Sequence, residues 1–338
     1  MKKYVLITGG CGYIGTHVAV ELLQDGYNIV IVDNLSNSSY EVLSNVTSII
    51  DKELKFEEGD VRDKKFLISI FKKYNISLVI HLSGLKSISE SIAYPLEYYD
   101  NNIQGTLNLL KIMGNFNVKK LIFSSSATVY GPSANLPCRE SSELVEPNNP
   151  YGYSKYCIER ILDDLAKSDS EWSIVKFRYF NPVGAHKSGL IGEYPQSTAT
   201  NLMPHILKAA NREGVLEIFG NDFLTEDGTA IRDFIHVTDL AKGHCSGIYF
   251  CNNNSGSHAF NLGTGKGYSV MNIVESFKES TGIEVEYKIS PRREGDSPAS
   301  FANVERARSI LGWTAKLNLN DMCKDSWKWS CFQKLNQK

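Results

Sequence analysis

The sequence has no apolar run of the roughly 18 residues that a membrane-spanning helix needs, so no membrane partner is expected. It also has no excess of one charge, because 36 Lys and Arg residues are set against 38 Asp and Glu residues. A nucleic-acid partner is not expected either, since such proteins usually carry a strongly basic surface. The 338 residues do contain 42% hydrophobic side chains, enough for a globular core. Their number is typical of about two domains.

Cysteine pairing is missing as well. The seven cysteines are an odd number, they are scattered from Cys11 to Cys331, and no two of them form a Cys-x-x-Cys pair. This spacing fits neither a disulfide framework nor a zinc site. We therefore expect reduced thiols, no bound metal and a cytoplasmic location.

The first half of the chain alternates short apolar runs with helical patterns. Strands are predicted near residues 4–8, 28–32, 77–81, 120–124 and 172–178, and helices near 14–24, 95–113 and 150–166. This alternation predicts an α/β fold with a doubly wound parallel Rossmann sheet. We expect a first domain over residues 1–181, to which 233–262 return, and a smaller mixed α/β domain over 182–232 and 263–338.

A glycine-rich loop follows the first predicted strand. Gly9, Gly12 and Gly15 form a Gly-x-x-Gly-x-x-Gly pattern that opens the first helix. Glycines at this place let the backbone approach a pyrophosphate at the helix N-terminus. Asp33 ends the second strand, 18 residues after Gly15, where a carboxylate can bind an adenosine ribose and repel a 2′-phosphate. The pattern predicts a dinucleotide site that holds NAD rather than NADP.

A tyrosine and a lysine stand one helical turn apart later in the chain. The Asn-Pro pair at 149–150 is a good helix start, so Tyr151 and Lys155 share one face of the following helix. A nearby ammonium group lowers the pKa of a phenol, which would let Tyr151 act as a general base. Ser126 lies at the end of a predicted strand and could orient a reacting hydroxyl toward Tyr151. We predict that Tyr151, Lys155 and Ser126 are catalytic.

The glycine pattern and the Tyr-x-x-x-Lys spacing together resemble the extended branch of the short-chain dehydrogenase/reductase superfamily. The likeness to its UDP-glucose 4-epimerase family runs along nearly the whole chain. The segments that carry it are Thr8–Gly15, Asp33–Leu35, Gly59–Val61, His81–Ser91, Pro95–Gly105, Phe123–Gly131, Pro150–Lys155, Arg178–His186, Asn201–Pro204, Ile218–Asp222, Thr225–Thr229 and Pro291–Asp296. The resemblance implies a homodimeric isomerase of galactose metabolism that interconverts UDP-galactose and UDP-glucose through a 4-keto sugar, with tightly bound NAD.

The resemblance also implies a set of NAD contacts. Within it, Tyr151 would take the proton of the sugar 4-hydroxyl, and Lys155 would hydrogen-bond the ribose of the cofactor. The positions that match the NAD site are Gly9, Gly12, Tyr13, Ile14, Gly15, Asp33, Asn34, Asn37, Ser38, Asp60, Val61, Leu82, Ser83, Gly84, Lys86, Asn101, Ser124, Tyr151, Lys155, Tyr179 and Phe180.

A second implied set would bind the nucleotide sugar. Its members are Lys86, Ser126, Tyr151, Asn181, Asn201, Leu202, Phe219, Arg232, Arg293, Asp296 and Ser300. Arg232 and Arg293 would pair with the diphosphate, since guanidinium groups suit phosphate geometry. Many bacterial members of the family have tyrosine where Ser300 stands, whereas members that accept N-acetylated sugars have a small residue. The resemblance therefore implies that UDP-GalNAc and UDP-GlcNAc are also interconverted.

Two other functions are open at this stage. Nucleotide-sugar 4,6-dehydratases resemble this chain, but they normally have an Asp-Glu pair beside the active-site threonine, and Ser126-Ala127-Thr128 contains no acid. A non-catalytic NAD-sensing regulator can use the same fold. Such proteins commonly lose the tyrosine or the lysine, and this chain has both.

Overall fold

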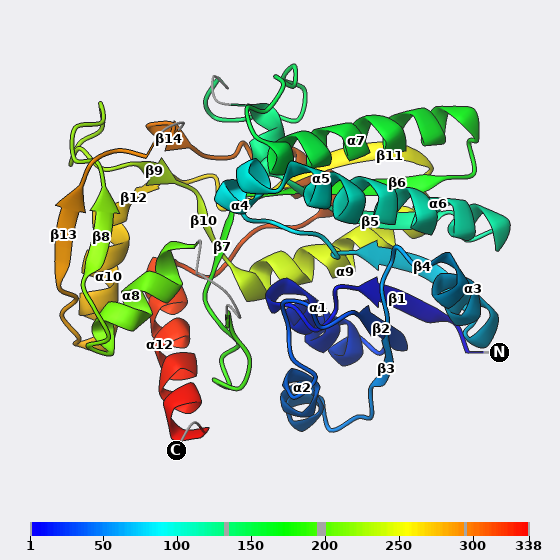
Figure 1. Cartoon of the computed structure of the whole chain (residues 1–338), viewed down its shortest axis with the longest axis horizontal. Coiled ribbons are helices and arrows are strands. Elements are labelled where there is room, and N and C mark those ends of the chain that lie inside the picture. Colours follow the sequence, from blue (N-terminus) through cyan, green and yellow to red (C-terminus); the bar gives the residue numbers. More distant parts are fainter. Residues whose placement is uncertain (1, 132–134, 195–200, 294–295, 337–338) are drawn as a thin grey trace. The chain divides into compact units, whose positions relative to one another are not determined.

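The computed structural model describes residues 2–131, 135–194, 201–293 and 296–336 (Figure 1). The chain forms two compact units. Unit 1 comprises Met1–Gly131, Glu143–Arg178 and Ala241–Phe260, and unit 2 comprises Pro132–Ser142, Tyr179–Leu240 and Asn261–Lys338.

Unit 1 is built on a seven-stranded sheet with the order β11-β6-β5-β4-β1-β2-β3. The strands are β1 (Tyr4–Thr8), β2 (Ile29–Asp33), β3 (Lys55–Glu58), β4 (Ile76–His81), β5 (Lys120–Ser126), β6 (Ser173–Tyr179) and β11 (Gly256–Leu262). Strand β1 pairs in parallel with β2 and β4, β2 with β3, and β4 with β5. All residues of β2 and β6 are buried, as their near-continuous apolar runs predict. The predicted doubly wound fold is confirmed, and the strand order reverses between β1 and β4.

Helices cover both faces of this sheet. They are α1 (Tyr13–Gln24), α2 (Val42–Ile50), α3 (Lys64–Lys73), α4 (Ile88–Ala93), α5 (Pro95–Tyr98), the π-helix η1 (Tyr99–Gln104), α6 (Gly105–Asn115), the 3₁₀ turn η2 (Ala127–Tyr130), α7 (Pro150–Ser168) and α9 (Val237–Asn253). Figure 1 shows α6 and α7 on one face and α1 and α9 on the other. One buried hydrophobic core contains strand residues of the sheet together with Leu67 of α3, Leu109 of α6 and Ile158 of α7. The single helix predicted at 95–113 is in fact divided into α5, η1 and α6.

Unit 2 consists of short strand pairs and helices around a second core. Strand β7 (Asn181–Val183) pairs with β10 (Phe234–His236), and β8 (Leu216–Phe219) pairs with β13 (Tyr287–Ser290). Strand β9 (Ile231–Arg232) lies between β12 (Tyr268–Ser269) and β14 (Ala299–Ser300). The helices are α8 (Leu202–Ala210), α10 (Val270–Thr281), α11 (Glu305–Leu311) and α12 (Leu319–Asn336). Their core includes Ile206, Phe234, Ile273, Phe277 and Met322.

The segment at 233–262 divides between two sheets. Strand β11 joins the large sheet, as expected for a segment that returns to the first domain, whereas β10 pairs with β7 instead. The backbone hydrogen bonds of β10 are therefore made to β7, and residues 233–240 belong to unit 2.

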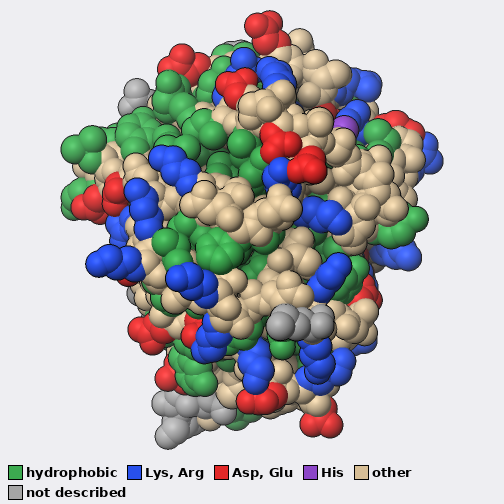
Figure 2. Space-filling model, turned by 90° about the vertical axis from the view of Figure 1, so that its right-hand side faces the viewer, with side chains coloured by type: hydrophobic (Ala, Val, Ile, Leu, Met, Phe, Trp, Pro, Cys, Tyr) green, Lys and Arg blue, Asp and Glu red, His purple; other side chains and the backbone are tan. Residues whose placement is uncertain are grey.

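The surface of the protein and the apolarity of its helices are as expected from the nearly equal numbers of acidic and basic residues and from the lack of a long apolar run. Figure 2 shows a face on which basic, acidic and hydrophobic side chains are intermixed. Among the described residues, no helix combines the length and the apolarity that crossing a membrane requires.

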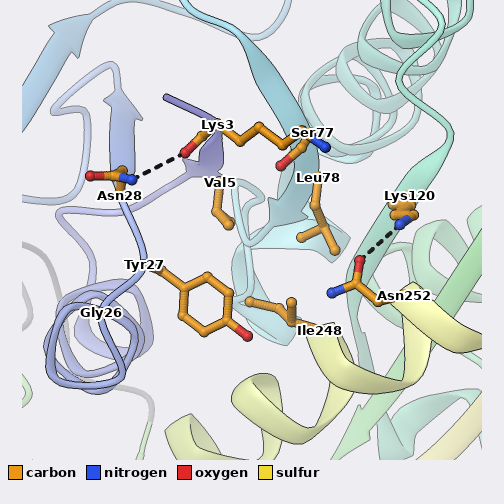
Figure 3. A pocket seen from close by; sticks show the side chains of 10 residues that line it. All are labelled: Lys3, Val5, Gly26, Tyr27, Asn28, Ser77, Leu78, Lys120, Ile248 and Asn252. Atoms are coloured by element: carbon orange, nitrogen blue, oxygen red, sulfur yellow. Dashed lines mark hydrogen bonds between the residues drawn. The ribbon is translucent and has the colours of Figure 1, made fainter. Parts of the chain in front are cut away.

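A pocket of about 330 Å³ lies at the amino ends of the strands of unit 1 (Figure 3). Its walls include Val5 of β1, Leu78 of β4 and Lys120 of β5, and Lys120 donates a hydrogen bond to Asn252 of α9 (2.8 Å). Ligands of doubly wound sheets bind at the carboxyl ends of the strands. This pocket is therefore at the opposite end of the sheet from the predicted site.

Two glycines of unit 1 differ in what a side chain would meet. A Cβ atom at Gly15 would lie 2.4 Å from the Gly9 carbonyl oxygen and 2.6 Å from the Gly10 Cα, whereas one at Gly114 of α6 meets nothing within 4 Å. We expect Gly15→Ala to lower the free energy of unfolding by about 1–3 kcal/mol because rigid backbone must move. Gly114→Ala should raise it by about 0.5–1 kcal/mol, since alanine favours helix. Urea unfolding measures both, and equal stabilities would contradict the prediction.

Candidate active site

The glycine loop joins β1 to α1. Gly9 has a φ of +71°, and a Cβ there would lie 2.6 Å from the Ser83 nitrogen, so glycine is required. Gly12 is the N-cap residue of α1 and has no side chain to cap the first turn, in which the predicted Tyr13 and Ile14 lie. Free N–H groups at a helix N-terminus suit an anion. The loop therefore fits the pyrophosphate of a dinucleotide.

Asp33, at the end of β2, is tied to this loop. Its Oδ2 accepts a hydrogen bond from the Cys11 nitrogen (3.0 Å), and its Oδ1 accepts bonds from the Leu35 nitrogen (3.0 Å) and the Ser38 hydroxyl (2.9 Å). The carboxylate is buried, with 8% of its surface exposed. It is therefore oriented in advance at the position where the sequence predicts the adenosine ribose. Asn37, in the turn that follows β2, is exposed.

Asp60 is the centre of a second polar group beside β2. Asn34 Nδ2 donates to its Oδ2 (2.9 Å), and Arg62 Nη2 forms an ion pair with the same oxygen (2.8 Å). Hydrogen bonds from Arg62 lower the pKa of Asp60 to about 2. Arg62 also pairs with Asp100 (2.9 Å). The sequence analysis named Asp60 but not Arg62. The predicted Val61, between them, is buried.

The loop after β4 is held by an asparagine that the sequence analysis did not select. Asn102 is buried in η1, accepts a bond from the Leu85 nitrogen (2.8 Å), and donates to the Leu85 carbonyl (3.1 Å) and to Ser154 of α7 (3.0 Å). The predicted Asn101 is half-buried beside it. Nothing in two successive asparagines indicates which of them turns inward.

This loop contains four more predicted cofactor residues. Leu82 donates from its nitrogen to the Thr8 carbonyl (3.0 Å), which fixes the start of the loop to β1. Ser83 follows against Gly9, and Gly84 lies near Lys155, since a Cβ at Gly84 would be 3.5 Å from Nζ. Lys86 is exposed. The loop therefore passes both the glycine turn and the predicted catalytic lysine.

The three predicted catalytic residues meet where β5 ends and α7 begins. Asn149 caps α7 by accepting a bond from the Gly152 nitrogen (2.8 Å), which places Tyr151 in the first turn. Ser126, the last residue of β5, lies close enough to Tyr151 to lower the pKa of its phenol. Lys155, which is 5% exposed, donates from Nζ to the Ser124 carbonyl (2.8 Å). A hydroxyl, a phenol and an ammonium group are thereby brought to one end of the sheet.

Burial changes the acidity of two of these groups in the protein alone. It raises the pKa of Tyr151, and the hydrogen bond with Ser126 acts in the opposite direction. Burial lowers the pKa of Lys155 to about 8. That Lys155 also lowers the pKa of Tyr151 stays a prediction.

Five of the residues predicted to bind the sugar nucleotide form one cluster around Asp296 in unit 2. Arg293 Nε pairs with Asp296 Oδ2 (2.9 Å), and Arg232 Nη2 lies 3.8 Å from Asp296 Oδ1. The Arg293 guanidinium lies 5.0 Å from the centre of the Phe219 ring. Pairing of β9 with β14 sets Ser300 opposite Arg232. Five of the predicted residues are thus close together although they are up to 81 positions apart (219 to 300).

Other predicted residues of unit 2 have separate surroundings. Asn201 donates from Nδ2 to Glu193 Oε1 (2.6 Å), and Leu202 begins α8. Asn181 donates from its nitrogen to the Asp233 carbonyl (2.9 Å), and Tyr179 and Phe180 before it are buried. Glu294 and Gly295, which belong to one segment of the resemblance, lie outside the described residues.

A doubly wound sheet, an uncapped glycine turn and a Ser-Tyr-Lys set define a dinucleotide-dependent enzyme that moves protons at a hydroxyl group. Comparison with known proteins identifies the family. The NAD dependent epimerase/dehydratase family model matches residues 5–263.

Individual relatives cover nearly all of the chain. A UDP-glucose 4-epimerase of Dictyostelium discoideum is 51% identical over 327 residues, 96% of this chain and 95% of that one. One from Bacillus subtilis is 49% identical over 326 residues, 96% of each chain. The crystal structure of UDP-glucose 4-epimerase from Bifidobacterium longum in complex with NAD⁺ and UDP has a TM-score of 0.95 and 47% identity, and covers 98% of this chain and 99% of that one.

The chain belongs to the NAD dependent epimerase/dehydratase family and, within it, to the UDP-glucose 4-epimerases. The predicted family, enzyme class and NAD cofactor are thereby confirmed. The dehydratase and the non-catalytic regulator are not favoured.

The lowered pKa of Lys155 predicts a pH-dependent stability. In the protein freed of NAD, the native state disfavours the ammonium form, so Lys155 destabilises the fold fully below pH 8, where both states are protonated. The penalty disappears as pH rises from about 8 toward 10.5, since the unfolded chain then also loses the proton. The unfolding free energy of Lys155→Met, taken relative to that of the parent protein, should be about 3 kcal/mol higher at pH 7 than at pH 10.5. A difference that urea unfolding finds constant with pH would contradict the lowered pKa.

Proposed function

We propose that the chain interconverts UDP-galactose and UDP-glucose through a 4-keto sugar, with Tyr151 moving the proton of the sugar 4-hydroxyl. The observation that carries this proposal is the placement of Tyr151 in the first turn of α7, with Lys155 one turn later held on the Ser124 carbonyl next to Ser126. The pair lies at the carboxyl end of β5, where ligands of such sheets bind. The relative from Bifidobacterium longum, which was solved with NAD⁺ and UDP, supports both ligands.

Unit 1 contains the residues that would hold NAD. The uncapped turn at Gly9–Gly15 would bind the pyrophosphate, and Asp33 would bind the adenosine ribose. Asp60 and Asn34 would lie at the adenine end, and the Lys155 ammonium group would reach the nicotinamide ribose. Bound NAD would supply the hydride acceptor for oxidation of the sugar C4 and the hydride donor for its reduction from the other face of the sugar.

The proton steps belong to side chains of the protein. Tyr151 takes the proton from the 4-hydroxyl as C4 is oxidised, and returns it to the same oxygen when C4 is reduced. Ser126 donates to the phenolate form of Tyr151, which opposes the effect of burial on its pKa. Lys155 adds a positive charge one turn along α7. No net oxidation of the sugar results, so one base serves both directions.

The cluster around Asp296 would bind the UDP part of the substrate. Arg232 and Arg293 supply two guanidinium groups for the diphosphate, and the carboxylate of Asp296 keeps both in place. Phe219 offers an aromatic face for the uracil ring. These roles assign the nucleotide to unit 2, as the proposed domain division requires.

Substrate range is proposed to include UDP-GalNAc and UDP-GlcNAc. Ser300 stands in β14 opposite Arg232 in β9, so it is next to a proposed diphosphate ligand. Its side chain is small, which leaves volume for an acetamido group at the sugar C2.

A homodimer and a cytoplasmic location complete the proposal. Ile92 and Leu96 on α4 and α5 are 62% and 80% exposed, and such large apolar side chains favour a contact with a second copy. A monomer mass in light scattering at micromolar concentration would contradict the dimer. Buried cysteines that form no disulfide, such as Cys251 and Cys323, suit a reducing compartment.

Tyr151→Phe tests the central role. The variant keeps the ring but has no proton to exchange, so turnover of UDP-galactose should fall at least about 100-fold. Binding of the UDP-sugar, measured by calorimetry, should stay close to that of the parent protein. Turnover near the parent rate would mean that another group is the base.

Ser300→Tyr tests the substrate range. The larger side chain should abolish turnover of UDP-GalNAc while UDP-galactose is still epimerised, because only the former has a bulky group at C2. Both rates are measured by chromatography of the products, with Tyr151→Phe as the blank. If the parent protein does not exceed that blank with UDP-GalNAc, this extension is wrong and the main proposal stands.

A further inference from the structure

A buried carboxylate lies directly behind the catalytic residues in unit 1. Glu159 is on α7, one turn after Lys155, and is 1% exposed. Its Oε1 accepts bonds from the Ser125 hydroxyl (2.6 Å) and Arg178 Nε (3.0 Å), and its Oε2 pairs with Arg178 Nη2 (2.7 Å). We call Glu159, Arg178 and Ser125 the Glu159 cluster. None of the three appears among the residues predicted from the sequence to be in the site.

The cluster joins the two elements that carry the reacting groups. Ser125 stands in β5 between Ser124, whose carbonyl binds Lys155, and Ser126, which lowers the pKa of Tyr151. Tyr151, Lys155 and Glu159 are spaced by four residues and therefore share one face of α7. Three successive residues of β5 thus make contacts with three successive turns of that face.

Arg178 fixes the cluster from β6. Its Nη1 donates to the Tyr130 hydroxyl (3.1 Å), and its guanidinium lies 4.9 Å from the centre of the Tyr130 ring. Tyr130 is the last residue of η2, which directly follows β5. The chain is therefore held on both sides of Ser126, by Ser125 before it and by Tyr130 after it.

We propose that Glu159 is a positioning residue for the epimerase reaction: with Arg178 and Ser125, it holds Ser126 against Tyr151. The inference rests on the proposed function of Tyr151. Stability alone gives little reason for such a cluster, because well-packed apolar residues often replace a buried ion pair without loss. A fixed bidentate geometry, in contrast, restricts the relative placement of β5 and α7.

The other charged groups around Glu159 define a matched control. Lys176 of β6 lies 3.8 Å from Glu159 Oε2 and pairs with Asp163 Oδ1 (2.5 Å), one turn further along α7. Asp163 shares the helix face and the ion-pair chemistry of Glu159, but its ion pair is with Lys176 of β6 and not with β5. Asp163→Asn therefore perturbs the same buried charges without loosening the serine strand.

The test compares Ser125→Ala, Glu159→Gln and Asp163→Asn in the NAD-containing protein, with Ser126→Ala as the reference. Losing the Ser126 contact removes the hydrogen bond that lowers the pKa of Tyr151, so the acid limb of the kcat profile should move to higher pH. Ser125→Ala and Glu159→Gln should shift the limb in the same direction as Ser126→Ala and lower kcat about fivefold or more, with KM little changed. Asp163→Asn should shift neither.

A second readout does not depend on turnover. In protein labelled with ¹³C at tyrosine Cζ, the Tyr151 signal is assigned by its absence in Tyr151→Phe. Its titration midpoint should rise in Ser125→Ala and Glu159→Gln and stay constant in Asp163→Asn. Ser125→Ala leaves the Glu159–Arg178 pair intact, so it decides the matter if Glu159→Gln does not fold.

The outcomes separate the two proposals. If Tyr151→Phe is inactive but Ser125→Ala matches Asp163→Asn in both readouts, the positioning role is refuted and the base assignment stands. A fall in kcat without any shift in the limb or the ¹³C titration also refutes it. If Tyr151→Phe turns over normally, the proposed function fails first.

Discussion

Contact between the end of β5 and the first turns of α7 is the constraint on which the site depends. Ser126 meets Tyr151, the Ser124 carbonyl meets Lys155, and Ser125 meets Glu159. These groups are brought together by a strand that ends at the carboxyl edge of a parallel sheet and a helix that starts beside it. Acidity follows from the same contact, because burial acts on Tyr151 and Lys155 in opposite directions.

In the rest of the proposed NAD site of unit 1, the carboxylates already have hydrogen-bond partners within the protein. Asp33 is oriented by the glycine turn and by Ser38, and Asp60 is oriented by Asn34 and Arg62. Such carboxylates lose little freedom when a ligand arrives, which favours tight binding. Tight binding would suit an enzyme whose reaction leaves its NAD cofactor unchanged overall.

In unit 2, side chains of the proposed site are likewise held in place by their neighbours, here through ion pairs between groups of opposite charge. Asp296 collects two guanidinium groups that would otherwise repel each other, and burial lowers the pKa of Arg232 while Asp296 raises it. Two cations fixed near one carboxylate form a compact site for a dianion such as a diphosphate. The strand pair β9–β14 then determines which side chain, Ser300, lies nearest to that site.

Local patterns in the sequence were sufficient for the sheet, for the glycine turn, and for placing Tyr151, Lys155 and Ser126 at one end of the sheet, because helical and strand periodicity position such residues by counting alone. Resemblance to a family added Arg232, Arg293 and Asp296, whose positions along the chain show no pattern. Neither route found Asn102, Arg62 or the Glu159 cluster. Asn101 and Asn102 look alike in sequence, and the π-helical turn decides which one faces inward. The partners of Glu159 lie 34 positions before it and 19 after it, so only the pairing of β5 and β6 with α7 could bring them into contact.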